Sequence, residues 1–264
     1  MTVPDVPPEL IALVHRLADA SGAAIRPYFR VHGIAEDKSD ATPVTAADRA
    51  GEHAIRDILA AERPHDGIWG EEMGRQNLDS EYLWIIDPID GTKAFVTGKP
   101  MFATLIALLH RGVPVLGIID QPVLRERWIG GAGHPTTFNG ARAATRVCAD
   151  LADAWFNATT PLMFAGKDDA PHRALTARVK HALYGGDAYA YGLLASGHID
   201  LIMEAQMKLH DFAALVPVIT AAGGAITGWN GEPLGMESSG YVLASGDPAL
   251  HKKALDVIRS AWAG

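Results

Sequence analysis

The sequence predicts a mixed α/β protein, of the α+β kind, in which layers of helices cover β-sheets. Three observations favour this class. Two amphipathic helical patterns open the chain, apolar segments then follow one another with only short turns between them, and the second half alternates strand-like and helix-like segments. With 264 residues, 48% of them hydrophobic and 20% charged, the chain is long enough to bury a sizeable core.

Two helices are expected at the start of the chain. Apolar side chains recur every three or four residues over 7–31, which predicts an amphipathic helix. Residues 33–44 are polar and irregular. A second helix is predicted over 45–61, with Ile55 and Leu59 among its inward-facing side chains.

The middle of the chain predicts an antiparallel sheet. Its apolar segments follow one another too closely to leave room for helices, which favours strands joined by short turns. These strands are expected at 67–70, 82–86, 102–109, 113–119 and 125–129.

The second half of the chain alternates strands and helices instead. Strands are expected near 154–158, 182–184, 199–204 and 240–245, and helices near 170–180, 187–197, 211–223 and 247–262. The pattern changes near 140–150, which divides the chain into an expected N-terminal half, 1–145, and an expected C-terminal half, 146–264.

Charge and composition exclude several classes of protein. The chain has 23 basic and 31 acidic residues, a formal net charge of −8, and no basic segment that would attract a nucleic acid. Cys148 is the single cysteine, so no internal disulfide can form. Residues 1–9 lack the basic residue of a signal peptide, and the longest weakly polar stretch, 212–226, is too short to span a membrane. We therefore expect a cytoplasmic protein without a nucleic-acid or membrane partner.

The most informative segment has the sequence Asp-Pro-Ile-Asp-Gly-Thr at 87–92 and directly follows an apolar strand. Two acids three residues apart at the end of a strand can converge on one point, with the backbone carbonyl of Ile89 between them. Hard cations such as Mg²⁺ bind to oxygen clusters of this kind. The backbone N–H groups of Gly91 and Thr92, where a short helix is expected to begin, favour a bound anion. A metal site beside an anion site indicates phosphate chemistry.

Each acidic motif also has a purely structural interpretation. Asp90 could cap a helix while Asp87 occupies a turn. Glu71 and Glu72 follow a short apolar strand, where a pair of acids is most often part of a solvated loop. Asp211 precedes an apolar helix and could simply cap it. The combination of these motifs in this order favours the functional interpretation.

The ordered set Gly-Glu-Glu, Asp-Pro-Ile-Asp-Gly-Thr and a late Asp before an apolar helix resembles the Mg²⁺-dependent inositol monophosphatase superfamily, over nearly the whole chain. The resemblance implies a layered α-β-α-β-α sandwich, a homodimer, and two or three Mg²⁺ ions in each active site. It also implies a set of metal ligands, most of them in the N-terminal half, while the C-terminal half supplies the last one and the substrate pocket. These ligands are Glu71, Asp87, the carbonyl of Ile89, Asp90 and Asp211.

The same resemblance implies catalytic roles for Thr92, Asp48 and Glu71. Thr92 would position the nucleophilic water and Asp48 would hydrogen-bond Thr92, although Asp48 and Thr45 also resemble a helix capping box. The metal ions would neutralise the phosphate monoester, lower the pKa of a bound water and stabilise the leaving alkoxide. No covalent phosphoenzyme is required by this mechanism.

Three further segments, 90–95, 120–130 and 184–192, resemble the histidinol-phosphate phosphatase branch of this superfamily. The substrate of that branch carries an ammonium group and a partly protonated imidazole, which acceptors and negative charges would bind. We expect Asp187 and Glu204 to bind that end of the substrate; the alternative is that both are acids in contact with solvent. The full set of expected substrate contacts is Asp90, Gly91, Thr92, Gly186, Asp187, Glu204 and Asp211.

The sequence departs from the wider superfamily at the late metal motif, where His210 and Leu215 replace the usual Trp and Gly. These departures concern the substrate rather than hydrolysis, and His210 is a candidate for substrate contact. Two alternatives to histidinol phosphate hydrolysis stay open. One is a phosphatase for inositol phosphate, another sugar phosphate or a nucleotide-derived phosphate, and the other is a metal-binding regulatory protein without turnover.

Overall fold

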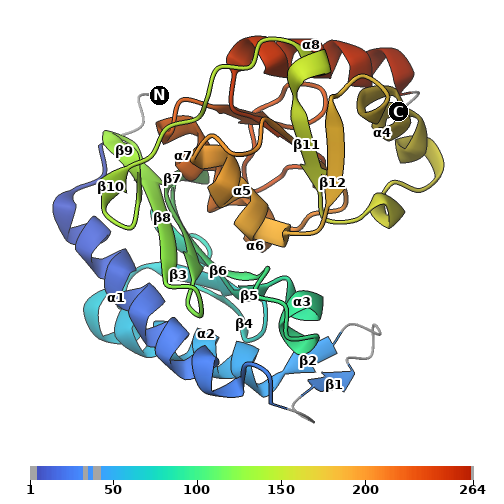
Figure 1. Ribbon diagram of the computed structural model, residues 1–264. Coiled ribbons are helices and arrows are strands. Elements are labelled where there is room, and N and C mark those ends of the chain that lie inside the picture. Colours follow the sequence, from blue (N-terminus) through green and yellow to red (C-terminus); the bar gives the residue numbers. More distant parts are fainter. Residues whose placement is uncertain (1–4, 32–34, 38–42, 263–264) are drawn as a thin grey trace.

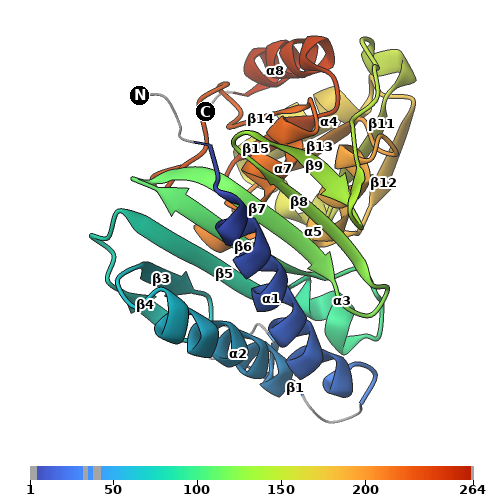
Figure 2. The same ribbon diagram turned by 90° about the vertical axis from the view of Figure 1, so that its left-hand side faces the viewer.

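The fold has five layers in which helices and sheets alternate (Figures 1 and 2). The computed structural model describes residues 5–31, 35–37 and 43–262. In order, the layers are helices α1 (Pro8–Ile25) and α2 (Ala46–Glu62), an eight-stranded sheet, helices α5 (Asp187–Ala195), α6 (Leu209–Phe212) and α7 (Leu215–Ala221), a five-stranded sheet, and helices α4 (Asp169–Thr176) and α8 (Pro248–Ala261). The predicted layered α-β-α-β-α sandwich is confirmed.

The larger sheet has the strand order β10-β9-β8-β7-β6-β5-β3-β4. Its strands are β3 (Gly67–Gly70), β4 (Gly74–Gln76), β5 (Tyr82–Asp90), β6 (Ala103–His110), β7 (Val113–Gln121), β8 (Glu126–Gly131), β9 (His134–Phe138) and β10 (Ala141–Arg142). From β5 to β10 they form an antiparallel meander, as the short spacing predicted, while β3 runs parallel to β5. The sequence did not indicate β4, β9 or β10, because these strands have at most one buried residue each and therefore leave no apolar pattern.

Both faces of this sheet are buried. Along β5, Leu83 and Ile85 belong to the core shared with α5, α6 and α7, whereas Trp84 and Ile86 belong to the core shared with α1 and α2. Successive side chains of a strand point to opposite faces, so a strand covered on both sides has a continuous apolar run. This double burial fixes the position of the C-terminal end of β5, where the acidic motif begins.

The smaller sheet has the strand order β12-β11-β13-β15-β14. Its strands are β11 (Trp155–Ala158), β12 (His181–Tyr184), β13 (Leu201–Glu204), β14 (Ala225–Thr227) and β15 (Val242–Ser245). β11 runs parallel to both β12 and β13, and β15 runs antiparallel to β13 and β14. Figure 1 shows β12 at the outer edge of this sheet, beside β11.

Two predicted helices end or break where the chain contains proline. The helix expected over 7–31 ends at Ile25 and continues as a 3₁₀ turn that contains Pro27. The helix expected over 211–223 forms the separate helices α6 and α7. Pro217 has no N–H to donate to the carbonyl of Ala213, which interrupts the helical ladder between them.

Residues 33–44, expected to be irregular, include most of two short strands. β1 (Ala35–Asp37) and β2 (Pro43–Thr45) pair in antiparallel fashion just before α2. Among the described residues, no helix combines the length and hydrophobicity that crossing a membrane requires.

Candidate active site

The acidic motif lies at the end of β5 and in the turn that follows. The pairing of β5 with β6 changes register between Asp87 and Asp90, so the strand is irregular where the two acids lie. The backbone N–H of Ile89 donates a 3.0 Å hydrogen bond to Asp87 Oδ1. Gly91 then has φ +89°, a left-handed conformation that favours glycine, and α3 (Thr92–Val96) begins directly after it.

Among the described residues, two clusters could hold a cation, and Asp87, Asp90 and Asp211 form the first of them. One ligand atom from each residue lies within 4.8 Å of the other two. Asp211 comes from α6, where its carboxylate accepts a 2.7 Å hydrogen bond from the Lys208 backbone N–H. Asp211 is therefore the third residue of its helix rather than the N-cap, but its carboxylate still caps the helix through this bond, as in a capping box.

Glu71, Asp87 and His210 form the second cluster, again with one ligand atom from each within 4.8 Å of the others. Glu71 directly follows β3, and its backbone N–H donates a 3.1 Å hydrogen bond to the carbonyl of Ile86 on β5. Parallel pairing of β3 with β5 thus brings the Gly-Glu-Glu motif to the same sheet edge as Asp87. The two clusters share Asp87 and form one site.

The fully buried carboxylate of Glu52, on α2, holds the loop that carries Glu71. It accepts hydrogen bonds from the backbone N–H groups of Glu72 at 2.8 Å and Met73 at 3.2 Å. It also pairs with the Arg56 guanidinium at 2.7 Å. A buried ion pair therefore fixes the backbone next to one expected metal ligand.

The site concentrates negative charge that a cation would neutralise. Asp87 is 1% exposed, and its burial, followed by the charges of Glu71 and Asp90, raises the pKa of its carboxyl group well above the ordinary value. Burial also raises the pKa of Asp90, with further contributions from Asp187 and Asp211. Carboxylate and carbonyl oxygens are the donors that hard cations prefer. The residues present therefore fit a divalent metal ion.

Asp48 and Thr92 lie next to the carboxylates. Asp48, in the first turn of α2, is 1% exposed, and its charge adds to the effect of burial in raising the pKa of Asp87. The Thr92 hydroxyl donates a 3.1 Å hydrogen bond to the Ile89 carbonyl, which ties the start of α3 to the acidic turn. The hydrogen bond expected between Asp48 and Thr92 stays a prediction.

The expected substrate residues reach the same place from the start of α5. Gly186 at φ +118° and Asp187 at φ +44° turn the chain sharply into the helix. The backbone N–H of Ala188 then donates a 2.5 Å hydrogen bond to Asp90 Oδ2. Asp187 lies over Gly91, because a Cβ atom at position 91 would be 3.1 Å from the Asp187 carboxyl carbon.

Glu204, at the end of β13, is buried, whereas Asp187 is partly exposed, so the solvent contact of the alternative interpretation is excluded only for Glu204. Burial raises the pKa of Asp187 to about 6, against the opposing charges of Lys93 and Lys99. Burial likewise raises the pKa of Glu204 to about 8, although the Thr159 backbone N–H donates a 2.7 Å hydrogen bond to its carboxylate. A cationic group next to these acids would favour their charged forms.

The expected site residues thus come together at one place, and the structure adds others. Glu52 and Lys99 were not indicated by the motifs, and His210, expected only as a substrate contact, lies against the carboxylates. The signal for His210 was its position directly before Asp211. Glu52 left no comparable signal, because an acid on an amphipathic helix is ordinarily exposed.

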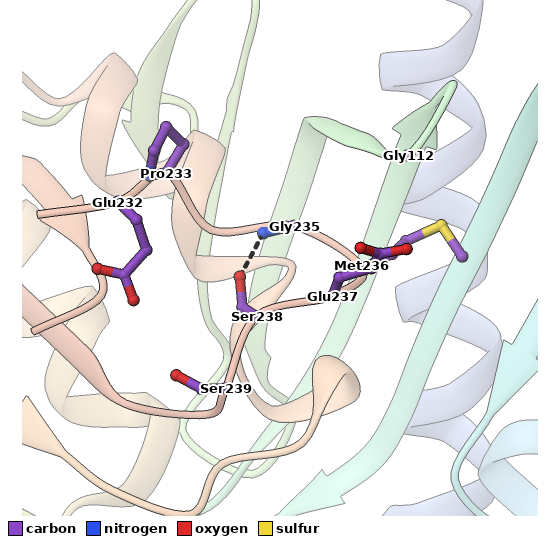
Figure 3. A pocket seen from close by; sticks show the side chains of 8 residues that line it. All are labelled: Gly112, Glu232, Pro233, Gly235, Met236, Glu237, Ser238 and Ser239. Atoms are coloured by element: carbon purple, nitrogen blue, oxygen red, sulfur yellow. Dashed lines mark hydrogen bonds between the residues drawn. The ribbon is translucent and has the colours of Figure 1, made fainter. Parts of the chain in front are cut away.

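A separate cavity of about 570 Å³ lies elsewhere on the molecule (Figure 3). The loop after β14 and the β6–β7 turn line it, through Gly112, Glu232, Pro233, Gly235, Met236, Glu237, Ser238 and Ser239. Within it the Ser238 hydroxyl accepts a 2.8 Å hydrogen bond from the Gly235 backbone N–H. None of the expected site residues lines this cavity.

Comparison with known proteins identifies the family. The model of the inositol monophosphatase family matches residues 7–263. The chain is 46% identical over 254 residues to the protein named bifunctional phosphatase IMPL2, chloroplastic, of Arabidopsis thaliana, a match that covers 93% of this chain and 73% of that relative. It is 37% identical over 228 residues to a histidinol-phosphatase of Mycobacterium tuberculosis, covering 84% of this chain and 88% of the relative.

The solved structures agree with this fold. The structure described as an inositol monophosphatase from Zymomonas mobilis superposes with a TM-score of 0.89 at 44% sequence identity. That match covers 97% of this chain and 100% of the other chain.

Proposed function

Because the chain belongs to the inositol monophosphatase family and is a phosphatase, we propose that it hydrolyses L-histidinol phosphate to L-histidinol and phosphate, a step of histidine biosynthesis. The observation that carries this proposal is a pair of acids beside the Asp90–Thr92 turn, the partly exposed Asp187 and the buried Glu204. An inositol ring offers only hydroxyl groups, whereas histidinol phosphate brings an ammonium group that these acids would bind. A relative named histidinol-phosphatase at 37% identity supports the same substrate.

We propose Mg²⁺ as the cofactor, with two or three ions held by Glu71, Asp87, the Ile89 carbonyl, Asp90 and Asp211. When bound, the ions neutralise the phosphate and make a water molecule nucleophilic at neutral pH. Thr92 and Asp48 orient that water for attack on phosphorus, in line with the leaving oxygen. The N–H groups of Gly91 and Thr92 donate to the phosphate oxygens. Gly186 keeps the start of α5 close to the bound substrate, so that Asp187 reaches the substrate amine.

Inositol 1-phosphate is the second candidate substrate, because the chain is 44% identical to a protein described as an inositol monophosphatase. Phosphate release with Mg²⁺ present separates the two proposals when histidinol phosphate, inositol 1-phosphate and several sugar phosphates are compared. We expect kcat/KM to be highest for histidinol phosphate, by a factor of about 10–100. One or two charge-assisted hydrogen bonds to the substrate amine contribute a free energy that corresponds to this factor. A flat profile or a preference for inositol 1-phosphate contradicts the proposal, and no turnover of any ester would favour a regulatory metal-binding protein.

We further propose a homodimer that forms through the edge of the five-stranded sheet. The edge strand β12 exposes all four of its side chains, including Leu183 and Tyr184, and Leu162 in the segment after β11 is 86% exposed. An exposed apolar edge strand favours association with another chain. We expect Leu183→Lys to convert a dimer into a monomer by light scattering, while Val147→Lys, at a position 90% exposed, leaves the dimer intact. A monomeric wild type contradicts the proposal.

A cytoplasmic location also belongs to this proposal. The single cysteine agrees with a reducing compartment, where disulfides are rare. Fractionation of the native organism would test it, and recovery outside the cytoplasm would contradict it.

A further inference from the structure

His210 occupies an unusual position for a histidine. Its side chain is 7% exposed, and its Nε2 atom lies 3.3 Å from Asp211 Oδ1 and 3.6 Å from Glu71 Oε1. Among the described residues, neither of its ring nitrogens has a hydrogen-bond partner. Buried polar groups are hydrogen-bonded in the great majority of cases, so a ring with two unpartnered nitrogens requires another explanation.

The surroundings of the ring supply that explanation. Glu71, Asp87 and His210 each offer one ligand atom, and these atoms lie within 4.8 Å of one another. Glu71 and Asp87 are expected metal ligands, and a shared cation is a partner that both carboxylates and an imidazole nitrogen can bind at once. Imidazole is a common ligand of divalent transition metals, whereas Mg²⁺ prefers oxygen.

We propose that His210 is a nitrogen ligand of the metal ion held by Glu71 and Asp87, so that this position binds Mn²⁺ more tightly than an all-oxygen site would. The proposal rests on the metal site of the proposed function but not on its substrate. It also assigns His210 a role other than the substrate contact expected from the sequence. The rest of the site, Asp90 and Asp211 with Asp87, keeps oxygen ligands only.

Pulsed electron paramagnetic resonance of bound Mn²⁺ tests this ligand directly, with the metal alone as probe and without turnover. The wild type is expected to show coupling of Mn²⁺ to a ¹⁴N nucleus, and the coupling should change to that of ¹⁵N when the protein is labelled with ¹⁵N-histidine. His210→Phe keeps a planar ring of similar size, and His210→Gln serves if that variant does not fold. Either is expected to lose the coupling and to bind Mn²⁺ about tenfold more weakly, with Mg²⁺ affinity changed less than threefold.

His53→Gln is the matched control, because His53 lies on the exposed face of α2 with 66% of its side chain accessible. This variant should keep the wild-type coupling and affinity. Mn²⁺ bound without any nitrogen coupling overturns the role of His210 while the carboxylate site stands. Mn²⁺ binding that Asp87→Asn leaves unchanged places the ion elsewhere and overturns both, because Asp87 belongs to both clusters.

Discussion

The backbone N–H of Ala188 donates a 2.5 Å hydrogen bond to Asp90 Oδ2, across 98 residues of sequence. The bond joins the end of β5 in the larger sheet to the start of α5, the helix between the two sheets. The carboxylate of Asp90 thus belongs to the expected metal site and also holds the start of the expected substrate loop. Metal binding and recognition of the alcohol portion of the substrate are therefore expected to depend on each other.

Asp187 should contribute to substrate binding more than to the chemical step. We expect Asp187→Asn to raise KM for histidinol phosphate about 10–100-fold, because one charge-assisted contact to the amine is lost, while kcat changes little. Asn is preferable to Ala here, because it tolerates the left-handed backbone at φ +44°. Steady-state kinetics on histidinol phosphate and on 4-nitrophenyl phosphate measure the difference. Equal losses on both esters would remove Asp187 from substrate recognition.

Asp90→Asn should abolish phosphate release while the fold survives. The amide oxygen of Asn can still accept the Ala188 N–H, but a ligand charge is lost, so we expect kcat to fall by a factor of at least about 100. The metal-free variant should unfold at a higher temperature than the metal-free wild type, because burial and neighbouring carboxylates disfavour the Asp90 charge. Asp79→Asn, an exposed acid in the turn after β4, is the control. A fully active Asp90→Asn would refute the metal mechanism.

Glu204 should make the metal-free protein less stable as the pH rises. Its folded-state pKa, raised by burial to about 8 from 4.5, means that the native state binds the proton more tightly than the unfolded state. The contribution of Glu204 to the free energy of unfolding is full below about pH 4.5. It then falls as the pH rises to about 8, by at most about 1.4 kcal/mol per pH unit.

Glu204→Gln, whose amide oxygen can still accept the Thr159 N–H, should lack this loss. We expect the variant to gain stability over the wild type as the pH rises from 5 to about 8. Thermal unfolding with EDTA present, over this range, measures the effect. Parallel pH profiles for the two proteins would contradict the assignment.

Glu52→Ala should weaken both the fold and the metal site. The change removes the carboxylate partner of Arg56, which keeps its hydrogen bond to the Gly74 carbonyl, and it removes the acceptor of the Glu72 and Met73 N–H groups. We therefore expect the free energy of unfolding to fall by about 3 kcal/mol. Mg²⁺ affinity should fall as well, because the loop after Glu71 loses its support. Urea unfolding and calorimetric titration measure the two effects, and Asp57→Ala on the exposed face of α2 is the control. Unchanged Mg²⁺ affinity in a folded variant would show that Glu52 does not position Glu71.

The sequence predicts those parts of the fold and of the site that depend on neighbouring residues and on clear apolar patterns. Asp87 and Asp90 lie three residues apart after an apolar strand, so their convergence follows from the strand and turn alone. Asp211 gave no such local evidence, and only the resemblance to a known family joined it to them. β4 was not predicted, because its three exposed residues show no alternation of apolar and polar side chains.

Other features depend on contacts between distant segments. The ring of His210 is placed among carboxylates by the packing of α6 against β5 and β6, which no spacing in the sequence encodes. Glu52 is a fully buried acid on a helix, and only the loop folded over it reveals its partners. The break between α6 and α7, in contrast, follows from Pro217 and was open to prediction.

The division of the site between segments far apart in the chain also has a consequence for protein synthesis. At about 5–20 residues per second, a ribosome needs about 5–20 seconds to add the 98 residues between Asp90 and Ala188. During that interval the nascent chain carries Asp87 and Asp90 but neither Asp187 nor Asp211. A polypeptide released early therefore lacks two of the expected site residues, and we expect it to hydrolyse no phosphate ester.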